Sequence, residues 1–481
     1  MHKQKSGIRW ILAILGAGAL ASLYLFGLTR IGLLGPDEPR YAAIGRAMAQ
    51  TGDWITPRLW GKPWFEKPAL LYWMTAAAFK AGLGPELAPR LPVAIASVAF
   101  LIYFFFALRR EFSERAAFFA VAVLATCAGW LAYSHVAVPD LPMSVAFSAA
   151  MFTILPSAVP GRARVSPATG ATAPVGRSTT MRRAALAGVL LGIAILGKGL
   201  VPLVLFVPAA WFLRRDIRAL LTVITIALAV AAPWYGLVAA RNGAAFFNEF
   251  FGKQQFARFL GGEFLHAQPL WFYVPVFAGV LFPWTPLALL AFSKRLYQDR
   301  RMAFLLAWFA FGFVFLSVSR GKLPGYLLPL LPPAAALIGI AADQARERSR
   351  FIMLVLAASA GLLWLVPTLQ AALPEALVSG VAHAPIHFFA VWLAPVVGLA
   401  AACMLLEAYG MRLAAVAAVA LFTTALIFRF TLGESAALDR EASARSRLIG
   451  HSVSITCVPQ ADPFLHYGFD YYADRELPDC K

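Results

Sequence analysis

The sequence predicts an all-α polytopic membrane protein, and three observations support this fold class. Sixty per cent of the 481 residues are hydrophobic and 14% are charged, whereas roughly 25% of a soluble domain is charged. Apolar runs of membrane-spanning length recur along the chain, and the mean hydropathy is +0.71. Clusters of Lys and Arg recur at every second loop between these runs. The net charge of +18 therefore indicates membrane orientation and not a nucleic-acid partner.

Windows of about 19 residues predict thirteen spans. The fifth and sixth are short and are compatible with one re-entrant pair. The predicted spans cover 8–29, 91–108, 115–133, 141–158, 184–197, 199–213, 217–238, 270–291, 302–318, 324–341, 351–367, 388–406 and 411–431. The first span has no convincing cleavage site for a signal peptidase, so we expect it to be retained.

The positive-inside rule orients these spans. Basic clusters fall within 3–9, 109–115, 162–183, 214–218, 294–301, 346–350 and at 412. The N-terminus and these loops are therefore expected in the cytoplasm, with the tail after Phe430 outside. Residues 159–183 are rich in Pro, Gly, Ser and Thr and are expected to be a flexible cytoplasmic linker. The chain thus divides into a membrane domain, 1–431, and a small outer domain, 432–481.

The outer loop after the first span is the leading candidate site. Asp37 and Glu38 lie where a membrane helix should end, and acids at such a boundary favour a functional role over a solvated loop. The loop continues to Trp73 with many ions and aromatic residues, which makes it costly to order unless it binds something. Segments 35–90 and 240–269 are expected to contain amphipathic helices lying in the interface. For 240–269 the alternative is a basic surface helix that binds anionic lipid.

Cations in the first outer loop suit a phosphate ligand. Arg40 offers a planar fork and Lys67 a point charge, although either could instead extend toward lipid headgroups. Glu66 precedes Lys67 and is expected to pair with it, to orient it or to contribute to a metal site.

Three later outward positions carry further candidates. Asp140 follows Pro139 at the start of the fourth span, where it suits a helix N-cap, an active-site acid or both. Lys198 lies between two short spans, as a membrane anchor or a phosphate ligand. Lys322 and Tyr326 lie on a Gly- and Pro-containing turn that is expected to carry them over a cavity.

The cysteines fall into two classes. Cys127 and Cys403 lie in apolar spans and are expected to pack as small hydrophobic residues. Cys457 and Cys480 lie in the outer tail, where an oxidising compartment favours a disulfide between them.

The sequence contains no phosphate-binding loop, His-Glu-x-x-His helix or dinucleotide fingerprint, so cytoplasmic nucleotide chemistry is not expected. The remaining pattern, acids, cations and aromatic residues at one membrane face, suits an amphiphilic substrate that carries a phosphate and a polar head.

These residues resemble a known motif series. The motifs Asp37–Ala42, Trp64–Pro68, Gly197–Gly199, Pro283–Trp284 and Lys322–Pro329 resemble, in order, those of bacterial aminoarabinose lipid A transferases and related protein O-mannosyltransferase-like enzymes. The resemblance implies the GT-C glycosyltransferase fold and a donor sugar carried on polyprenyl phosphate. It also implies a multi-pass protein of the bacterial inner membrane with a periplasmic active site, and no required cofactor.

The resemblance implies roles for individual residues. The expected catalytic acids are Asp37, Glu38 and Asp140. The expected donor-binding residues are Arg40, Tyr41, Arg58, Glu66, Lys67, Lys198, Arg258, Lys322 and Tyr326. Family members commonly carry His or Asn a few residues before the arginine that matches Arg258, whereas this chain has Gln255. A metal ion there has only Glu66 and His266 as weak candidates.

The expected reaction is attack by an acceptor on the anomeric carbon of the lipid-linked sugar, with Asp37 as base or orienting group and the cations stabilising the departing phosphate. Lipid A is the expected acceptor, with a protein or another glycan as alternatives. A lipid or sugar transporter and a non-catalytic polysaccharide-assembly protein remain as other classes. Transporters place charges near the midplane, often within internal repeats, and neither feature is evident in this sequence.

Overall fold

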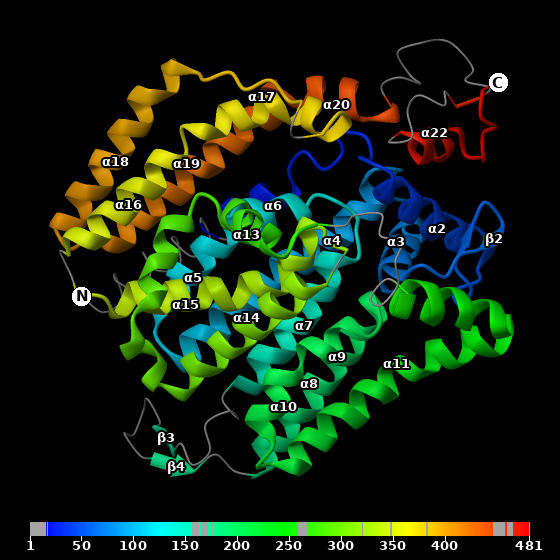
Figure 1. Cartoon of the computed structure of the whole chain (residues 1–481), viewed down its shortest axis with the longest axis horizontal. Coiled ribbons are helices and arrows are strands. Elements are labelled where there is room, and N and C mark those ends of the chain that lie inside the picture. Colours follow the sequence, from blue (N-terminus) through cyan, green and yellow to red (C-terminus); the bar gives the residue numbers. More distant parts are fainter. Residues whose placement is uncertain are drawn as a thin grey trace.

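The chain folds into a bundle of helices with two short hairpins (Figure 1). The computed structural model describes residues 16, 18–155, 163–165, 172–174, 177–257, 268–319, 321–346, 349–380, 383–445, 457–458 and 465–480. Within these residues, eight helices are long and apolar enough to cross a membrane. They cover Leu87–Glu111, Thr180–Lys198, Ile217–Gln254, Arg300–Val318, Pro324–Gln344, Arg350–Val378, Ala390–Ala408 and Arg412–Gly433. Multi-pass architecture is therefore confirmed.

The other predicted spans are shorter, broken or outside the described residues. The first part of 8–29 lies outside them. The 115–133 run divides into α5 (Glu114–Thr126) and α6 (Ala128–Tyr133), and the 199–213 run into α9 (Val201–Leu205) and α10 (Val207–Leu213). The fourth predicted span is the short helix α7 (Asp140–Ile154). The 270–291 run is two segments, Leu270–Leu281 and Thr285–Phe292, bent by 113°.

Two of these breaks stabilise each other. At the break between α5 and α6, the Ala128 amide donates to the Phe282 carbonyl at 2.8 Å. Trp284, at the bend after α13 (Tyr273–Leu281), donates its indole N–H to the Thr126 hydroxyl at 2.9 Å. Backbone groups freed within an apolar environment need such partners. Hydropathy alone could not reveal the breaks, because each run stays apolar across them.

The core is built around α15 (Leu331–Gln344), whose span is 94% buried. It packs on α5 so closely that a Cβ at Gly339 would lie 2.5 Å from the Ala120 amide nitrogen. Helices α7, α8 (Arg177–Lys198) and α11 (Ile217–Phe246) pack side by side in the lower part of the bundle (Figure 1). Small residues permit this close approach between membrane helices.

The remaining helices complete the bundle and its edges. These are α2 (Asp37–Thr51), α3 (Leu70–Lys80), α4 (Leu87–Glu111), α14 (Arg300–Val318), α16 (Arg350–Leu362), α17 (Leu365–Val378), α18 (Leu393–Ala408), α19 (Arg412–Gly433), α20 (Ser435–Ala442) and α22 (His466–Ala473). The hairpins pair β1 (Arg58–Leu59) with β2 (Lys62–Pro63), and β3 (Ala163–Val165) with β4 (Thr172–Pro174).

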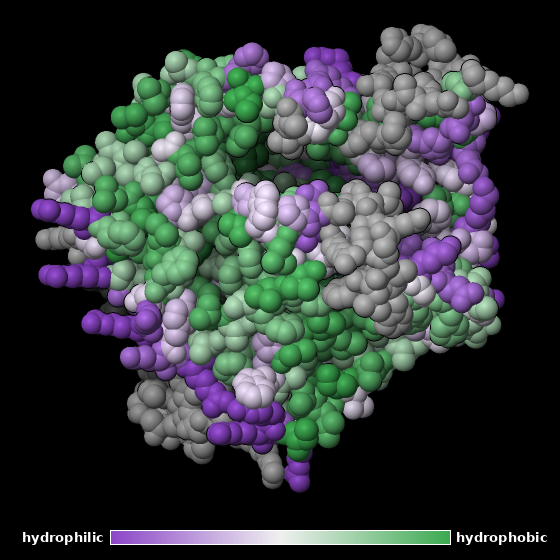
Figure 2. All heavy atoms as spheres, viewed as in Figure 1, coloured by the Kyte–Doolittle hydropathy of each residue, from purple (hydrophilic) through white to green (hydrophobic). Residues whose placement is uncertain are grey.

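Elements far apart in sequence gather along one edge. Helices α2, α3, α20 and α22 lie along the top and upper right, while β3 and β4 lie at the bottom (Figure 1). An apolar surface covers much of the bundle between hydrophilic margins at the lower left and at the upper right (Figure 2). The outer loop and the described part of the tail therefore meet, and the described strands of the 159–183 linker lie at the opposite edge.

One prediction about local structure needs correction. The linker was expected to lack regular structure, but its described part contains β3 and β4, and α8 begins at Arg177 within it. The 240–269 segment was expected to be a separate helical piece, and its described part agrees. The chain kinks at Gly243, whose φ is +52°, and a second helical stretch follows the kink and passes into a π-helix over Phe247–Ala257. Its amphipathic, interfacial character stays a prediction.

Candidate functional site

Four charged residues form a connected cluster at the start of α2. One helical turn places Arg40 beside Asp37, and the two form an ion pair. The Arg40 Nη2 also lies 2.9 Å from Glu66 Oε2, and the Lys67 Nζ lies 2.7 Å from Glu66 Oε1. The Tyr41 hydroxyl donates to Glu66 at 3.5 Å. The structure thus brings together residues that the two motifs of the first outer loop supply.

Exposure differs sharply within this cluster. The side chain of Asp37 is 45% exposed, whereas those of Arg40 and Glu66 are 14% and 9% exposed. Burial raises the pKa of Asp37, the charge of Arg40 opposes that shift, and Glu66 and Asp140 add to it. Asp37 is therefore the accessible carboxylate of the cluster, and its raised pKa suits a group that exchanges a proton.

Aromatic rings surround the guanidinium of Arg40. Its carbon Cζ lies 5.2 Å from the Tyr41 ring centroid, 5.5 Å from that of Trp64 and 5.2 Å from that of Tyr467. The Nε of Arg40 is buried, and none of the described residues is a hydrogen-bond partner for it. Arg40 is thus held in place by rings and carboxylates while one of its donors remains unused.

A second ion pair adjoins the first cluster. Lys198, at the end of α8, lies 2.5 Å from Asp140 and 3.8 Å from the Tyr326 ring centroid. The turn before Tyr326 packs tightly, because a Cβ at Gly325 would lie 2.7 Å from the Tyr133 ring. Since Asp140 influences the pKa of Asp37, both clusters belong to one electrostatic site.

The N-cap interpretation of Asp140 is wrong. Pro139 occupies the cap position of α7 without a side-chain cap bond, and Asp140 is the first helical residue. Its carboxylate pairs with Lys198 instead.

Glu38 lies apart from these exposed groups. It is fully buried, and its Oε1 accepts from Arg90 at 2.6 Å and from the Ala137 amide at 2.9 Å. Its Oε2 accepts from Arg90 at 2.7 Å and from the Leu34 amide at 2.7 Å. Because a carboxylate has about four acceptor positions, these contacts saturate it. These contacts suit a positioning role for Glu38, and the catalytic role that we expected stays a prediction.

The turn over 28–34, which leads into Asp37, is held from two sides. On the inner side, Arg90 donates to the carbonyls of Leu28, Ile31 and Gly32 at 2.8, 2.5 and 2.9 Å. On the outer side, Arg445 donates to the carbonyls of Thr29 and Arg30, each at 2.8 Å.

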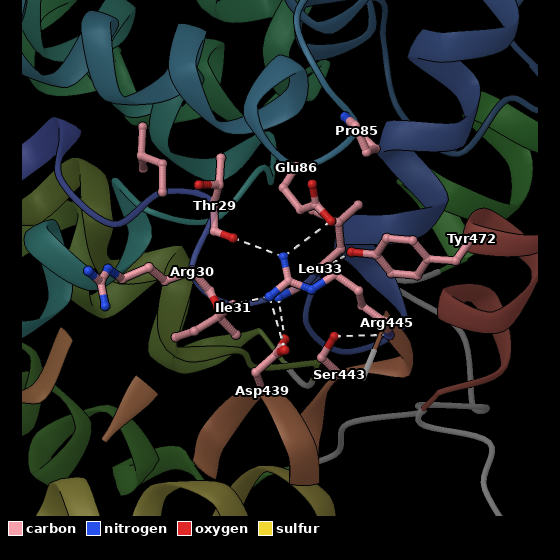
Figure 3. A network of polar contacts seen from close by, with 12 residues as sticks. Thr29, Arg30, Ile31, Leu33, Pro85, Glu86, Asp439, Ser443, Arg445 and Tyr472 are labelled. Carbon is pink, nitrogen blue, oxygen red and sulfur yellow. Dashed lines mark hydrogen bonds and ion pairs between the residues drawn. The ribbon is translucent and has the colours of Figure 1, made fainter. Parts of the chain in front are cut away.

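The C-terminal region supplies two more contacts to this turn (Figure 3). The Asp439 Oδ1 accepts from the Gly32 amide at 2.6 Å, and the Tyr472 hydroxyl accepts from the Leu33 amide at 2.9 Å. Asp439 also pairs with Arg445 at 2.9 Å. Residues more than 400 positions away therefore fix the backbone that precedes the candidate site.

Other expected residues lie outside the connected clusters. Arg58 donates to the Gly61 carbonyl at 3.2 Å and lies 3.9 Å from Asp53, so its contacts stabilise the β1–β2 hairpin. Lys322 is 3% exposed and donates to the Gln268 carbonyl at 2.9 Å, and burial lowers its pKa. Arg258 and His266 lie outside the described residues.

The disulfide expectation can be checked, whereas the metal expectation stays a prediction because His266 lies outside the described residues. Among the described residues, no group of three or more His, Cys, Asp or Glu side chains is arranged to hold a metal ion. Cys457 and Cys480 form the expected disulfide, and Cys127 and Cys403 are buried and unbonded, as expected.

Sequence reasoning missed several residues around the site. Arg90, at the start of an apolar span, carried a usable signal, because an arginine there requires a partner. Asp439, Arg445, Tyr467 and Tyr472 carried none, since no periodicity links the tail to the first loop.

The fold and the clustered charges at one face define a polytopic GT-C membrane protein. The sequence matches the family model "Dolichyl-phosphate-mannose-protein mannosyltransferase" over residues 10–242. The chain is similar to ArnT-like GT-C glycosyltransferases, as the following comparisons show.

Two similar proteins are named undecaprenyl phosphate-alpha-4-amino-4-deoxy-L-arabinose arabinosyl transferases. The one from Pseudomonas fluorescens is 32% identical over 351 residues, covering 69% of this chain and 56% of that protein. The one from Pseudomonas aeruginosa is 33% identical over 342 residues, covering 68% of this chain and 58% of that protein. The matched regions thus span less than two thirds of these relatives' lengths.

The fold is similar to that of solved ArnT structures. ArnT from Cupriavidus metallidurans bound to undecaprenyl phosphate has a TM-score of 0.70 and 24% identity, covering 97% of this chain and 85% of that one. Its apo structure has a TM-score of 0.73 and 23% identity, covering 98% and 86%. These similarities establish the fold.

Proposed function

We propose that the chain transfers a sugar from undecaprenyl phosphate to an acceptor on the periplasmic face of the membrane. The sugar is of the 4-amino-4-deoxy-L-arabinose type and the acceptor is lipid A. The observation that supports this most directly is the cluster in which the half-exposed Asp37 lies beside the buried cations Arg40 and Lys67. The names of the relatives supply the substrate class.

In this mechanism, Arg40 and Lys67 bind the donor phosphate. Both already lie against Glu66, which holds them within reach of one anion. The acceptor oxygen attacks the anomeric carbon, the bond from that carbon to the phosphate oxygen breaks, and the electron pair leaves with undecaprenyl phosphate. Fixed cations in a partly desolvated site stabilise the charge that develops on this leaving group.

Asp37 acts on the acceptor. If the acceptor is a hydroxyl, Asp37 removes its proton, and if it is a phosphate anion, Asp37 orients it. Lys198, held by Asp140 and packed on Tyr326, lies on the same electrostatic site and is assigned to the donor. No step in this scheme uses a soluble cofactor.

The proposal includes a topology. The protein crosses the bacterial inner membrane thirteen times, with its N-terminus in the cytoplasm. Residues 1–431 form the membrane domain and 432–481 a periplasmic domain. The short helices α6, α7, α9 and α10 then complete spans that are bent or broken. The meeting of α2 and α22 at one edge supports a common periplasmic side (Figure 1).

Mass spectrometry of lipid A tests this function in cells that carry the wild-type gene, a deletion, Asp37→Asn or Asp474→Asn. Asp474, which follows α22 as its C-cap, has a side chain that is 61% exposed and pairs with Arg46. We expect one sugar-sized mass to disappear with the deletion and with Asp37→Asn only. Unchanged lipid A in all four strains would refute the lipid A acceptor. Full transfer by Asp37→Asn would refute the role of Asp37.

A metal requirement is tested separately. Transfer by the purified enzyme is measured after chelation and after readdition of divalent cations. Unchanged activity would rule out the weak Glu66 and His266 metal prediction.

A further inference from the structure

One of the three rings around Arg40 comes from the far end of the chain. Tyr467 lies in α22, and its ring centroid is 5.2 Å from the Arg40 Cζ. Tyr41 and Trp64 come from the first outer loop, only one and 24 residues from Arg40. The C-terminal region therefore contributes directly to the cation cluster.

Contacts between α2 and α22 fix the position of Tyr467. The Arg46 guanidinium lies 4.2 Å from the Tyr471 ring centroid, donates to the Tyr471 carbonyl at 2.8 Å and pairs with Asp474 at 2.9 Å. The Tyr471 hydroxyl donates to the Pro85 carbonyl at 2.7 Å. Helix α22 is thus anchored on α2 one to two turns beyond Arg40.

The segment that carries α22 is also held internally. The disulfide between Cys457 and Cys480 joins its ends. The Val458 amide donates to the Pro478 carbonyl at 2.8 Å, and the Cys480 amide donates to the Val458 carbonyl at 2.9 Å. A separate small core contains Ala444, Val458, Leu465, Phe469 and Leu477. This unit can therefore present Tyr467 in a defined position.

Arg40 is held in a position where its remaining hydrogen-bond donor can bind an additional anion. Aromatic rings interact with the guanidinium through cation–π contacts, while Asp37 and Glu66 use part of its hydrogen-bonding edge. The buried Nε donor has no partner in the described part of the chain, and an unpaired buried donor is costly unless a ligand satisfies it. A phosphate oxygen is an acceptor of the required chemistry.

We propose that Tyr467 is a positioning residue that holds Arg40 for the phosphate of a lipid-linked donor, so that the C-terminal unit forms part of the donor site. This inference rests on the proposed function. It extends the site beyond the motifs of the first outer loop and predicts that Tyr467 acts through Arg40.

Binding of undecaprenyl phosphate to the full-length protein in nanodiscs tests this assignment. We expect Tyr467→Ala to raise the Kd about fivefold, the effect of losing one cation–π contact worth about 1 kcal/mol. Tyr467→Phe should bind as wild type, because the ring remains. In steady-state assays, Tyr467→Ala should raise the donor KM more than it lowers kcat. Tyr409→Ala is the matched control, because Tyr409 is 74% exposed and follows α18, on the other side of the molecule from α2 and α22 (Figure 1).

A double-mutant cycle with Arg40→Gln separates positioning from general stability. If Tyr467 acts through Arg40, Tyr467→Ala has no further effect on Kd in the Arg40→Gln background. Additive effects, wild-type binding by Tyr467→Ala or equal weakening by Tyr409→Ala would each overturn the inference. Wild-type protein that neither binds undecaprenyl phosphate nor transfers sugar would overturn the proposed function, and the inference with it. Wild-type activity with an unaffected Tyr467→Ala variant would overturn the inference alone.

Discussion

Replacing Glu38 with Gln should destabilise the protein, whereas replacing the adjacent Asp37 with Asn should leave its stability near wild type. Glu38 is fully buried against Arg90, and all four of its acceptor positions are used. Asp37 is half-exposed and has one described ion pair. Two neighbouring acids thus differ in role because helix α2 turns one inward and the other outward.

The magnitude follows from the contacts that change. In wild type, the Leu34 amide and the Arg90 Nη2 both donate to the Glu38 Oε2. In Glu38→Gln, an NH2 group in that place is a donor and cannot accept from them. The variant also leaves the buried Arg90 without a counter-charge. Loss of one partner from a buried ion pair typically costs about 3–5 kcal/mol. For Asp37→Asn we expect a change within about 1 kcal/mol, as for an exposed ion pair.

Melting in detergent and transfer assays on the same preparations distinguish these roles. We expect Glu38→Gln to lower the apparent Tm and the yield of folded protein, with activity falling in proportion to the folded fraction. Asp37→Asn should melt near wild type and lose transfer. A Glu38→Gln variant that melts like wild type and lacks activity would refute the positioning role and restore the catalytic one.

Three further predictions concern the same site. Burial raises the pKa of Asp37 above 3.8, and a general base must be deprotonated. The kcat/KM for a hydroxyl acceptor should therefore fall on acidification with a midpoint above pH 3.8. A midpoint at or below pH 3.8 would contradict this. Lys198→Gln should raise the donor KM about tenfold through loss of a charge-assisted contact. Lys253, whose side chain is 73% exposed in its ion pair with Glu249, is the control, and Lys253→Gln should not change the donor KM. Equal kinetics for both variants would show that Lys198 is not part of the donor site. Arg445→Gln should lower kcat about tenfold with the donor KM nearly unchanged. The substitution removes hydrogen bonds to the turn before Asp37, and leaving such buried groups unpaired costs about 1–3 kcal/mol. A kcat equal to wild type would show that Arg445 does not position Asp37.

The sequence predicted the part of the site that is local in the chain. Asp37 and Arg40 are one helical turn apart, and Glu66 and Lys67 are adjacent, so short motifs specify each pair. Hydropathy likewise predicted where the apolar runs lie. It could not separate a continuous helix from one broken at Cys127, because the pattern that marks an apolar run is unchanged by a break.

The remainder of the site depends on long-range contacts. Glu38 and Arg90 are 52 residues apart, and Arg445 contacts a carbonyl 416 residues away. A single sequence carries no periodic signal for such pairs. A buried arginine nevertheless requires a partner. This requirement singles out Arg90 in the sequence, but it does not say which residue is its partner.

The charges of the first cluster indicate that the donor is selected by the geometry of the site more than by its net charge. Asp37 and Glu66 balance Arg40 and Lys67, so these four side chains have no net charge at neutral pH when all are ionised. Such a site attracts free anions weakly. It binds a phosphate well only where a ligand reaches the unpaired Nε of Arg40 and the nearby ammonium together. A lipid-anchored phosphate, delivered at a fixed depth beside the outer loop, meets that requirement, and the cation–π contact from Tyr467 to Arg40 helps to fix where it is met.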